Sequence, residues 1–465
     1  MNPIMTNITP DSLSGILFAL EGVDKICTLL NGPTGCKFYH SAISDNQRIF
    51  QHELDPMNHH EDFFFGQPRI PSTYLDKRDY VYGSRDKLNM AIKYIEANFD
   101  YEMICVVNSP GAALIGDDLE GILSSACQHT PYMTIQTPGF SENISTGYEY
   151  GVISLLEKLS GNDQADNVST GSRSTKSPHP TMTVNDCQDG QASILSSLNK
   201  KNQEPVVNLL GLPIYKNYYD GDIKEITRLL GMCGIKVASS LCSDCSLEDI
   251  RNLKNGALNI VVDREYGEKT AKWLYDHTGV KYFVSPCLPI GFEETEKFIK
   301  SICHVLNCSD APFIEEAERA RALAYIQLSR LNSLTGLPRG VGFAVKGSYN
   351  QCFSYSNFLI RYLGMIPRAF LVDDPEVDFL KNDLNALLEE RHMASMLSKD
   401  FYDEDFHIAI ADGSTIAKLK LLKKEFSGIE NSLPSMGYIN VIPKTHLGLN
   451  GALLLIEQIL NGLIF

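Results

Sequence analysis

The chain has 465 residues, 43% of them hydrophobic and 21% charged, a composition that is typical of globular proteins and excludes disordered and fibrous ones. Its formal net charge of -16 argues against non-specific binding to nucleic acids, which requires a basic face. No apolar run approaches the roughly 20 residues that a membrane span needs, and residues 1–10 show no signal-peptide pattern. We therefore expect a cytoplasmic protein of several domains whose partners include neither nucleic acid nor membrane.

Residues 1–160 show the alternation of strands and helices that is typical of an α/β domain. Short apolar runs predict buried strands, and apolar residues at three- and four-residue spacing predict helices. The expected strands are 26–30, 103–107 and 132–136, and the expected helices are 85–98, 117–127 and 147–159. The polar and aperiodic residues 161–195 follow, and we interpret them as a linker or a long surface loop.

Two further series of the same kind complete the chain. In residues 196–332 the expected strands are 205–210, 235–238, 258–262 and 282–285, and the expected helices are 222–231, 246–252, 267–277, 295–306 and 314–332. In residues 333–465 the expected strands are 340–345, 366–372 and 406–411, and the expected helices are 353–363, 379–397 and 451–463. The pattern predicts an α/β protein with mostly parallel sheets and three domains, at 1–160, 196–332 and 333–465.

A turn dense in glycine and proline follows the first expected strand. It reads Asn-Gly-Pro-Thr-Gly-Cys at residues 31–36 and ends with Cys36. In open α/β sheets ligands bind at the carboxyl edge of the strands, so this turn would present one thiol at a binding edge. Without a secretion signal, the 12 cysteines of the chain should be reduced thiols.

A second cysteine pattern is the CxxC formed by Cys242 and Cys245. A zinc site usually needs a second pair of ligands, and the nearest other cysteines are single ones. A redox CxxC would follow a strand and open a helix, which this one nearly does. Structural thiols and a metal or redox site therefore both stay open. The chain contains neither a P-loop GxxxxGK[ST] nor a GxSxG sequence, so no catalytic residue of those classes is assigned.

Four motifs, in order along the chain, resemble the nitrogenase component 1 superfamily. They are the turn at 31–36, Tyr-Val-Tyr-Gly-Ser-Arg-Asp-Lys-Leu at 80–88, Leu-Ile-Gly-Asp-Asp at 114–118 and His-Leu-Gly-Leu-Asn-Gly at 446–451. The superfamily includes the α and β chains of the molybdenum–iron protein, their cofactor-assembly scaffolds and the dark-operative protochlorophyllide reductase chains. The resemblance covers nearly the whole chain and implies three Rossmann-like domains around a cofactor cavity.

The resemblance also assigns roles to single residues. Cys36 matches the turn cysteine that in the family ligates an inter-subunit iron–sulfur cluster, and a thiolate is a good ligand for iron. Ser109 stands at the second cluster position and Asp11 in the region of the earliest one, where each could supply an oxygen ligand. Asp263 and Gly437 stand where the α chain binds its catalytic cofactor, which argues against a nitrogenase-type catalytic cofactor bound in the usual way.

A cluster of four irons needs four ligands, and Cys36 supplies one, so we expect a partner chain to supply the missing ones. The resemblance predicts a β-type subunit of a nitrogenase-like reductase that shares a [4Fe-4S] cluster with an α-type paralogous subunit. An ATP-dependent iron protein would deliver the electrons that pass to a substrate site. Two alternatives stay open. One is a non-catalytic scaffold for the assembly of a metallocofactor, and the other is a structural partner chain that binds no cluster.

Overall fold

The computed structural model describes most of the chain, and these residues form two compact units. One unit contains residues 10–165 and 242–251, and the other contains residues 204–241 and 252–464. The division into three domains stays a prediction, and most of the predicted linker lies outside the described residues. The described residues are 10–33, 35–36, 70–137, 142–165, 204–422, 424–433 and 442–464.

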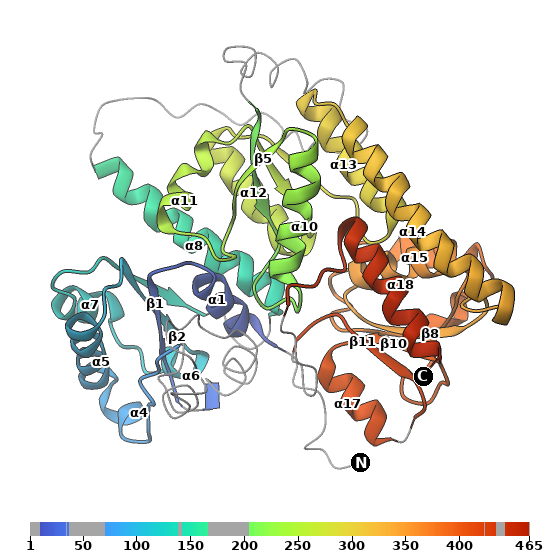
Figure 1. Ribbon diagram of the computed structural model, residues 1–465. Helices are drawn as coiled ribbons and strands as arrows, with labels where there is room; N and C mark the ends of the chain where they lie inside the picture. Colours follow the sequence, from blue (N-terminus) through green and yellow to red (C-terminus); the bar gives the residue numbers. More distant parts are fainter. Residues whose placement is uncertain are drawn as a thin grey trace, which may run out of the picture. The chain divides into compact units, whose positions relative to one another are not determined.

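The first unit is built on a sheet of three parallel strands in the order β1-β2-β3. Its strands are Ile26–Asn31 (β1), Met103–Asn108 (β2) and Tyr132–Gln136 (β3), and its helices are Ser12–Glu21 (α1), Asp79–Tyr82 (α4), Arg85–Asn98 (α5), Pro110–Ala113 (α6), Leu119–Ala126 (α7), Ile144–Ala165 (α8) and Leu247–Asn252 (α11). Apolar side chains of β1 and β2 pack against α5 and α7, and Figure 1 shows α1 on the other side of these strands. Strands β1 and β2 are therefore buried along their whole length, as expected for a parallel sheet between helices.

Helices α1 and α8 pack closely because glycines lie at their contact. A Cβ atom at Gly15 would lie 2.1 Å from the carbonyl oxygen of Ile144, and one at Gly147 would lie 2.0 Å from the carbonyl oxygen of Ser12. A larger residue at either position would collide with backbone, so glycine permits this approach. The contact fixes the first turn of α1, where Asp11 is the N-cap residue.

The second unit contains two sheets, each of four parallel strands. The first has the order β5-β4-β6-β7, and the second has the order β11-β10-β8-β9. The elements of the first sheet and its helices are Val206–Leu210 (β4), Tyr219–Met232 (α10), Lys236–Ser240 (β5), Leu253–Asn255 (η2), Leu258–Val261 (β6), Arg264–Thr278 (α12), Tyr282–Val284 (β7), Phe292–Leu306 (α13) and Ala311–Thr335 (α14). The elements of the second are Gly342–Gly347 (β8), Tyr349–Arg361 (α15), Ile366–Val372 (β9), Lys381–Glu389 (α16), Ala394–Ser398 (η3), Ile408–Ala411 (β10), Gly413–Leu421 (α17), Ser427–Glu430 (β11) and Gly448–Ile464 (α18).

A single hydrophobic core joins the two sheets of this unit, with side chains from α10, α13, α14, α15 and α18. The three parallel sheets flanked by helices confirm the predicted α/β class. The strands that the apolar runs predicted are all present, with ends that differ by a few residues. They were predictable because a strand that is buried on both faces needs a nearly continuous apolar run.

The structure differs from the prediction mainly in the last third of the chain. The single helix predicted at 379–397 is two elements, α16 and η3, because the chain turns at His392, whose φ of 58° lies in the left-handed region. Strand β11 was not predicted, since Ile429 is its one strongly apolar residue. Helices α6 and α17 were not predicted either. Both follow strands directly and are capped by the side chains of Ser109 and Asp412.

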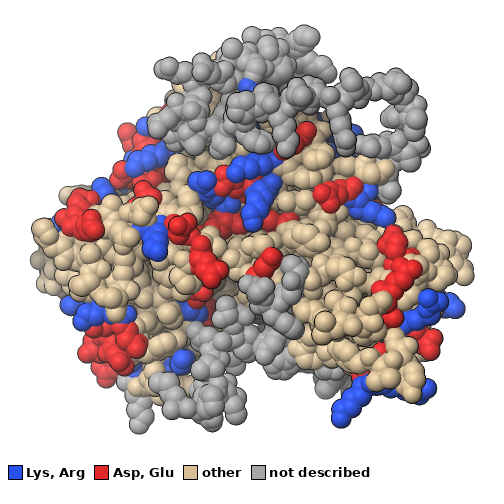
Figure 2. All heavy atoms as spheres, turned by 180° about the vertical axis from the view of Figure 1, so that it is seen from behind, with Lys and Arg blue, Asp and Glu red and all other residues tan. Residues whose placement is uncertain are grey.

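The surface of the described residues carries both signs of charge. On the face seen in Figure 2, Lys and Arg side chains stand beside Asp and Glu side chains. Some of these opposite charges form ion pairs within one helix. Examples are Lys272 with Glu268 at 3.2 Å on α12 and Lys297 with Glu293 at 2.8 Å on α13. No helix in the described part of the chain is long and apolar enough to cross a membrane.

Candidate functional site

The turn that follows β1 places Cys36 beside Ser109, the residue that follows β2. Strands β1 and β2 are parallel with Asn31 opposite Asn108, so the residues after them meet at the same edge of the sheet. A Cβ atom at Gly32 would lie 2.7 Å from Ser109 Oγ and 3.7 Å from Cys36 Cβ. The missing side chain at Gly32 therefore leaves the space in which the thiol and the hydroxyl come together.

The two residues predicted as oxygen ligands both cap helices. Ser109 is fully buried, and its hydroxyl accepts a hydrogen bond from the Ala112 amide of α6 at 3.2 Å. Asp11 Oδ1 accepts hydrogen bonds from the amide and the hydroxyl of Ser14, both at 3.0 Å. Such caps satisfy amides that have no partner inside the helix, which gives both residues a structural role. The structure places Ser109 next to Cys36, and the charge of Asp11 acts on the Cys36 thiol from the start of α1.

The environment of Cys36 keeps its thiol protonated. Partial burial raises the pKa of Cys36, a hydrogen bond with the Ser109 side chain lowers it, and the carboxylate of Asp11 raises it, with a net upward shift. A thiolate, and not a thiol, binds metal ions, so a bound cation would have to displace this proton. Cys36 is half-buried, so the residue is partly open to solvent.

Three amide side chains hold this edge of the sheet together. Asn31 donates to Asn108 Oδ1 at 3.0 Å, and Asn108 donates to Gln136 Oε1 at 3.0 Å. The hydroxyl of Thr73 donates to Asn31 Oδ1 at 2.9 Å and accepts from the Gly32 amide at 3.1 Å. Sequence reasoning missed this amide ladder. The available signal was a polar residue at the last position of three neighbouring apolar strands.

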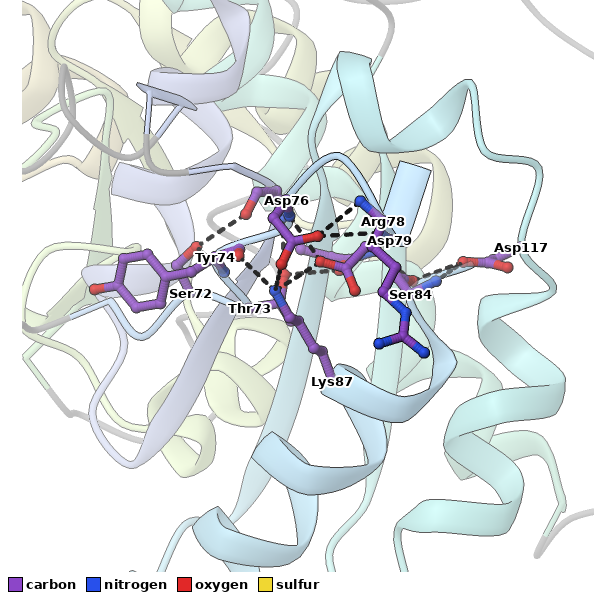
Figure 3. Close-up of polar contacts among 11 residues, drawn as sticks. Ser72, Thr73, Tyr74, Asp76, Arg78, Asp79, Ser84, Lys87 and Asp117 are labelled. Carbon is purple, nitrogen blue, oxygen red and sulfur yellow. Dashed lines mark hydrogen bonds and ion pairs between the residues drawn. The ribbon is translucent and has the colours of Figure 1, made fainter. Parts of the chain in front are cut away.

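Residues of the motifs at 80–88 and 114–118 contact each other, as Figure 3 shows for Ser84 and Asp117. Ser84 is buried and donates from its amide and its hydroxyl to Asp117 Oδ2 at 2.6 and 2.7 Å. The same hydroxyl accepts a hydrogen bond from Asn31 at 3.2 Å. Lys87 forms an ion pair with Asp79 at 2.6 Å. These motif residues therefore support the turn that carries the thiol.

Large apolar side chains border this turn and are exposed. Tyr80 lies against the first turn of α6, and its pKa is raised by burial and then by the neighbouring Cys36. On the same short helix, Val81 and Tyr82 are 73% and 81% exposed, and Leu114, just after α6, is 89% exposed. Exposed apolar side chains that gather in this way commonly mark an interaction surface.

In the second unit, a carboxylate stands where the resemblance places a cofactor cysteine. Asp263 follows β6 and caps α12, where its side chain accepts a hydrogen bond from the Glu265 amide at 3.2 Å. It also accepts from the Asn350 side chain at 3.1 Å and pairs with Lys216 at 3.6 Å. A buried carboxylate with these partners does not fit the soft ligand that a metal–sulfur cofactor requires. The other expected position, Gly437, lies outside the described residues.

His446 and Asp222 are buried near this carboxylate and have partners within the chain. His446 Nδ1 bonds to the Tyr355 hydroxyl at 2.7 Å and Nε2 to Gln458 Oε1 at 3.0 Å, and burial lowers the pKa of His446 to about 4. Asp222 Oδ1 accepts from the Thr445 hydroxyl at 2.6 Å, and burial raises the pKa of Asp222 to about 7. The imidazole is therefore neutral at physiological pH, whereas the carboxyl group titrates there.

A cavity of about 40 Å³ lies among these groups, with Lys216, Asp222, Asp263 and His446 in its wall. It lies at the carboxyl ends of β4 and β6, the edge at which open α/β sheets bind ligands. A water molecule needs roughly 10–15 Å³ of such space, so the cavity has room for a few waters.

The CxxC of Cys242 and Cys245 forms a buried turn in the first unit. The Cys242 amide donates to Cys245 Sγ at 3.3 Å, and the Asp24 amide donates to the Cys245 carbonyl oxygen at 2.8 Å. Burial raises the pKa of Cys245 to about 11 and also raises that of Cys242. Buried, protonated thiols of this kind are unreactive, which favours a structural role for the pair.

Within the residues that the structure describes, no group of three or more His, Cys, Asp or Glu side chains is arranged to hold a metal ion by itself. A model of the family described as Nitrogenase component 1 type Oxidoreductase matches residues 12–464 of the chain. The chain belongs to this family. The family that the four sequence motifs predicted is thereby confirmed.

The relatives of this chain include a nitrogenase chain, a reductase subunit and a protein of cofactor biosynthesis. The chain is 19% identical, over its full length, to the nitrogenase iron-iron protein beta chain of Rhodobacter capsulatus, 94% of which is covered. It is 23% identical to one of the chains of the light-independent protochlorophyllide reductase of Heliobacterium modesticaldum over 76% of the present chain, a match that spans 58% of that relative. It is 24% identical to the nitrogenase iron-molybdenum cofactor biosynthesis protein NifE of Clostridium pasteurianum over 63% of the chain and 53% of the relative.

The fold is shared with solved structures of nitrogenase component 1. The structure titled "Nitrogenase Cp1 at pH 6.5" superposes with a TM-score of 0.70 at 18% identity and covers 99% of this chain and 93% of that one. The last family motif has a structural role here. The Asn450 amide and side chain donate to Glu225 at 3.0 and 2.7 Å, and Gly448 takes a φ of 75° beside the same glutamate. The motif thus joins α18 to α10.

Proposed function

We propose that this chain is one subunit of a nitrogenase-like reductase complex in which Cys36 supplies one ligand of a [4Fe-4S] cluster shared with an α-type paralogous subunit. The observation that carries the proposal is a half-buried thiol at the carboxyl edge of the first sheet, bordered by exposed apolar side chains. Membership of the nitrogenase component 1 family supports the class of complex. An ATP-dependent iron protein is the proposed electron donor.

The donor set around Cys36 fits one ligand of such a cluster. Four irons need four ligands, and thiolates are the usual ones. Ser109 and Asp11 already accept hydrogen bonds from helix amides, so we assign the remaining ligands to the partner subunit. The raised pKa of Cys36 means that iron binding would release a proton, which makes the binding pH-dependent.

The residues around Cys36 would position the thiolate and exclude water from it. When bound, the cluster supplies one-electron transfer. The amide ladder and the Ser84–Asp117 contact hold the turn in place, so that the sulfur is presented without a rearrangement of the sheet. Val81, Tyr82 and Leu114 would be covered by the partner subunit, which would remove the adjacent surface from water.

Anaerobic purification of this chain together with its α-type paralogue tests the proposal. We expect iron and sulfide in the complex at about four of each per cluster, and an EPR signal after reduction. The Cys36→Ser variant should lose most of the iron, whereas Cys127→Ser, which changes another half-buried thiol of the same unit, should retain it. A complex that contains no iron, or a Cys36→Ser complex that keeps the full amount, would contradict the proposal.

The second candidate function is a scaffold for assembly of a nitrogenase-type metallocofactor. The similarity to the cofactor biosynthesis protein NifE favours it, because the chain is related to that protein as well as to reductase subunits. A reductase complex should oxidise its reduced cluster when substrate, ATP and the iron protein are added. A scaffold should instead transfer a bound metallocluster to an acceptor protein that lacks one.

A further inference from the structure

A second cavity of the second unit lies between the first turn of α13 and the last turns of α15. Its volume is about 70 Å³. It shares Ile290 with the wall of the cavity at Asp263, and its other lining residues are different. At roughly 10–15 Å³ for each water, it has room for about five to seven waters, which is the size of a molecule of about six non-hydrogen atoms.

Aromatic side chains form the apolar wall of this cavity. Phe292 and Phe358 are buried, and the ring of Tyr362 stacks on Phe358 with a centroid distance of 5.4 Å and meets Phe292 edge to face at 5.1 Å. A Cβ atom at Gly291 would lie 2.4 Å from the Phe358 ring, so glycine, with a φ of 82°, permits the turn to approach this ring. The wall thus offers apolar surface to a small side chain.

The first turn of α13 offers backbone amides to the cavity. Phe292, Glu293 and Glu294 are the first three residues of this 15-residue helix, and all three line the cavity. The N-cap residue Gly291 has no side chain that could cap them, and the structure shows no acceptor for their amides among the described residues. Amides at a helix N-terminus are good donors to a carboxylate.

A guanidinium group adds a second donor for a carboxylate. Arg361, at the end of α15, also lines the cavity. It donates to Glu390 Oε2 at 2.9 Å, and both side chains are about half-exposed. An exposed pair of this kind is weak, and a guanidinium has five N–H donors, so Arg361 can bind a second carboxylate.

The same cavity also contains hydrogen-bond acceptors. Asn357 is 7% exposed, and its Nδ2 donates to Glu294 Oε1 at 3.0 Å, whereas its Oδ1 receives no hydrogen bond from the described residues. A buried oxygen without a donor costs free energy, so a donor from outside the chain would be bound favourably there. The carboxylate of Glu294, which pairs with Lys297 at 2.9 Å, can accept further hydrogen bonds.

We propose that this cavity binds a small α-amino acid as its zwitterion, of about the size of alanine. Its carboxylate would accept hydrogen bonds from the first amides of α13 and from Arg361, and its ammonium group would donate to Asn357 Oδ1 and Glu294. Its methyl group would contact the aromatic wall. A carboxylate alone would leave the acceptors unfilled, and an amine alone would leave the amides without an acceptor. The proposal is independent of the cluster at Cys36, which lies in the other unit.

Isothermal titration calorimetry of the full-length chain with three ligands tests the proposal. Alanine carries both charged groups, whereas propionate lacks the ammonium group and n-propylamine lacks the carboxylate. We expect one saturable site for alanine with a dissociation constant on the order of 1 mM, and binding weaker by roughly tenfold or more for the other two. The proposal is overturned if alanine shows no saturable binding, or if propionate or n-propylamine binds as tightly as alanine.

A variant of the guanidinium group locates the site. In Arg361→Gln we expect alanine to bind roughly tenfold more weakly than in the wild type, because the carboxylate loses its cation. The matched control Arg319→Gln removes an exposed guanidinium of α14, which pairs with Glu315 at 3.4 Å, and should leave the affinity unchanged. Wild-type affinity in Arg361→Gln would also overturn the proposal. The comparison of the three ligands on the wild-type chain decides the question even where a variant fails to fold.

Discussion

The carboxyl edges of the first sheet and of the β4–β7 sheet carry similar polar residues but arrange them differently. At the first edge, Asn31 and Asn108 bond to each other and leave Cys36 half-buried beside exposed apolar side chains. At the second edge, Asp263 and Lys216 are paired, and the cavity beside them has a volume of about 40 Å³. The first edge is thus held rigid but open, and the second is filled by the chain's own side chains.

The two edges therefore differ in the groups that they offer to a molecule outside the chain. At the second edge, Asp263 Oδ1 accepts two hydrogen bonds, whereas Oδ2 is held by the ion pair with Lys216 and accepts no hydrogen bond from the described residues. The first edge offers a thiol and apolar surface that no described residue covers. Stability should therefore depend most strongly on the second edge, and assembly with a partner on the first.

The largest expected effect comes from breaking the ion pair of the second edge. In Lys216→Met the buried carboxylate of Asp263 loses its cation, and we expect the local free energy of unfolding to fall by about 3 kcal/mol. Lys272→Met, which removes an exposed ion pair with Glu268, should cost no more than about 1 kcal/mol. Hydrogen exchange of the β4 and β6 amides measures both. An equal fall in the free energy of unfolding in both variants would show that the buried Lys216 pair stabilises the chain no more than the exposed pair does.

A smaller effect is expected from loosening the first edge. Ser84→Ala removes the hydroxyl that joins Asp117 to Asn31, and the unsatisfied buried groups should cost about 2 kcal/mol. The control Ser124→Ala removes an exposed hydroxyl on α7 and should change the stability by no more than about 0.5 kcal/mol. Because the turn loosens, Cys36 should also react faster with iodoacetamide in Ser84→Ala. An unchanged labelling rate would mean that Ser84 does not support the turn.

The smallest effect concerns pH at the second edge. Burial raises the pKa of Asp222 from 3.8 to about 7, so folding takes up a proton between these values and the stability of the chain falls as pH rises through them. In Asp222→Asn this fall should be absent, while the acceptor oxygen for Thr445 remains. Thermal unfolding from pH 5 to pH 8 should show the variant gaining a few degrees relative to the wild type at the alkaline end. Parallel curves would mean that Asp222 does not titrate in this range.

Much of the fold could be predicted from the sequence, but less of the site could be. Buried parallel strands need continuous apolar runs, which is why β1, β2 and β6 could be found, whereas β11 has a single apolar residue and could not. The motifs predicted the family and singled out Cys36, Ser109 and Asp11, of which the structure places Ser109 beside Cys36. Their roles at a cluster stay a prediction. Ser109 and Asp11 cap α6 and α1, and the motifs did not predict the residues at which these helices begin.

The sequence by itself determined the α/β class and, through its resemblance to a known family, the nitrogenase component 1 family, and it placed Cys36 after the end of a strand. Local periodicity is enough for the α/β class, because it depends on neighbouring residues, whereas the family follows from the resemblance of the four motifs. Only the tertiary structure decided which polar groups pair within the chain, as Asp263 does with Lys216 and Ser84 with Asp117. Such pairs join residues from distant segments, and their hydrogen bonds and desolvation arise only when the segments pack together.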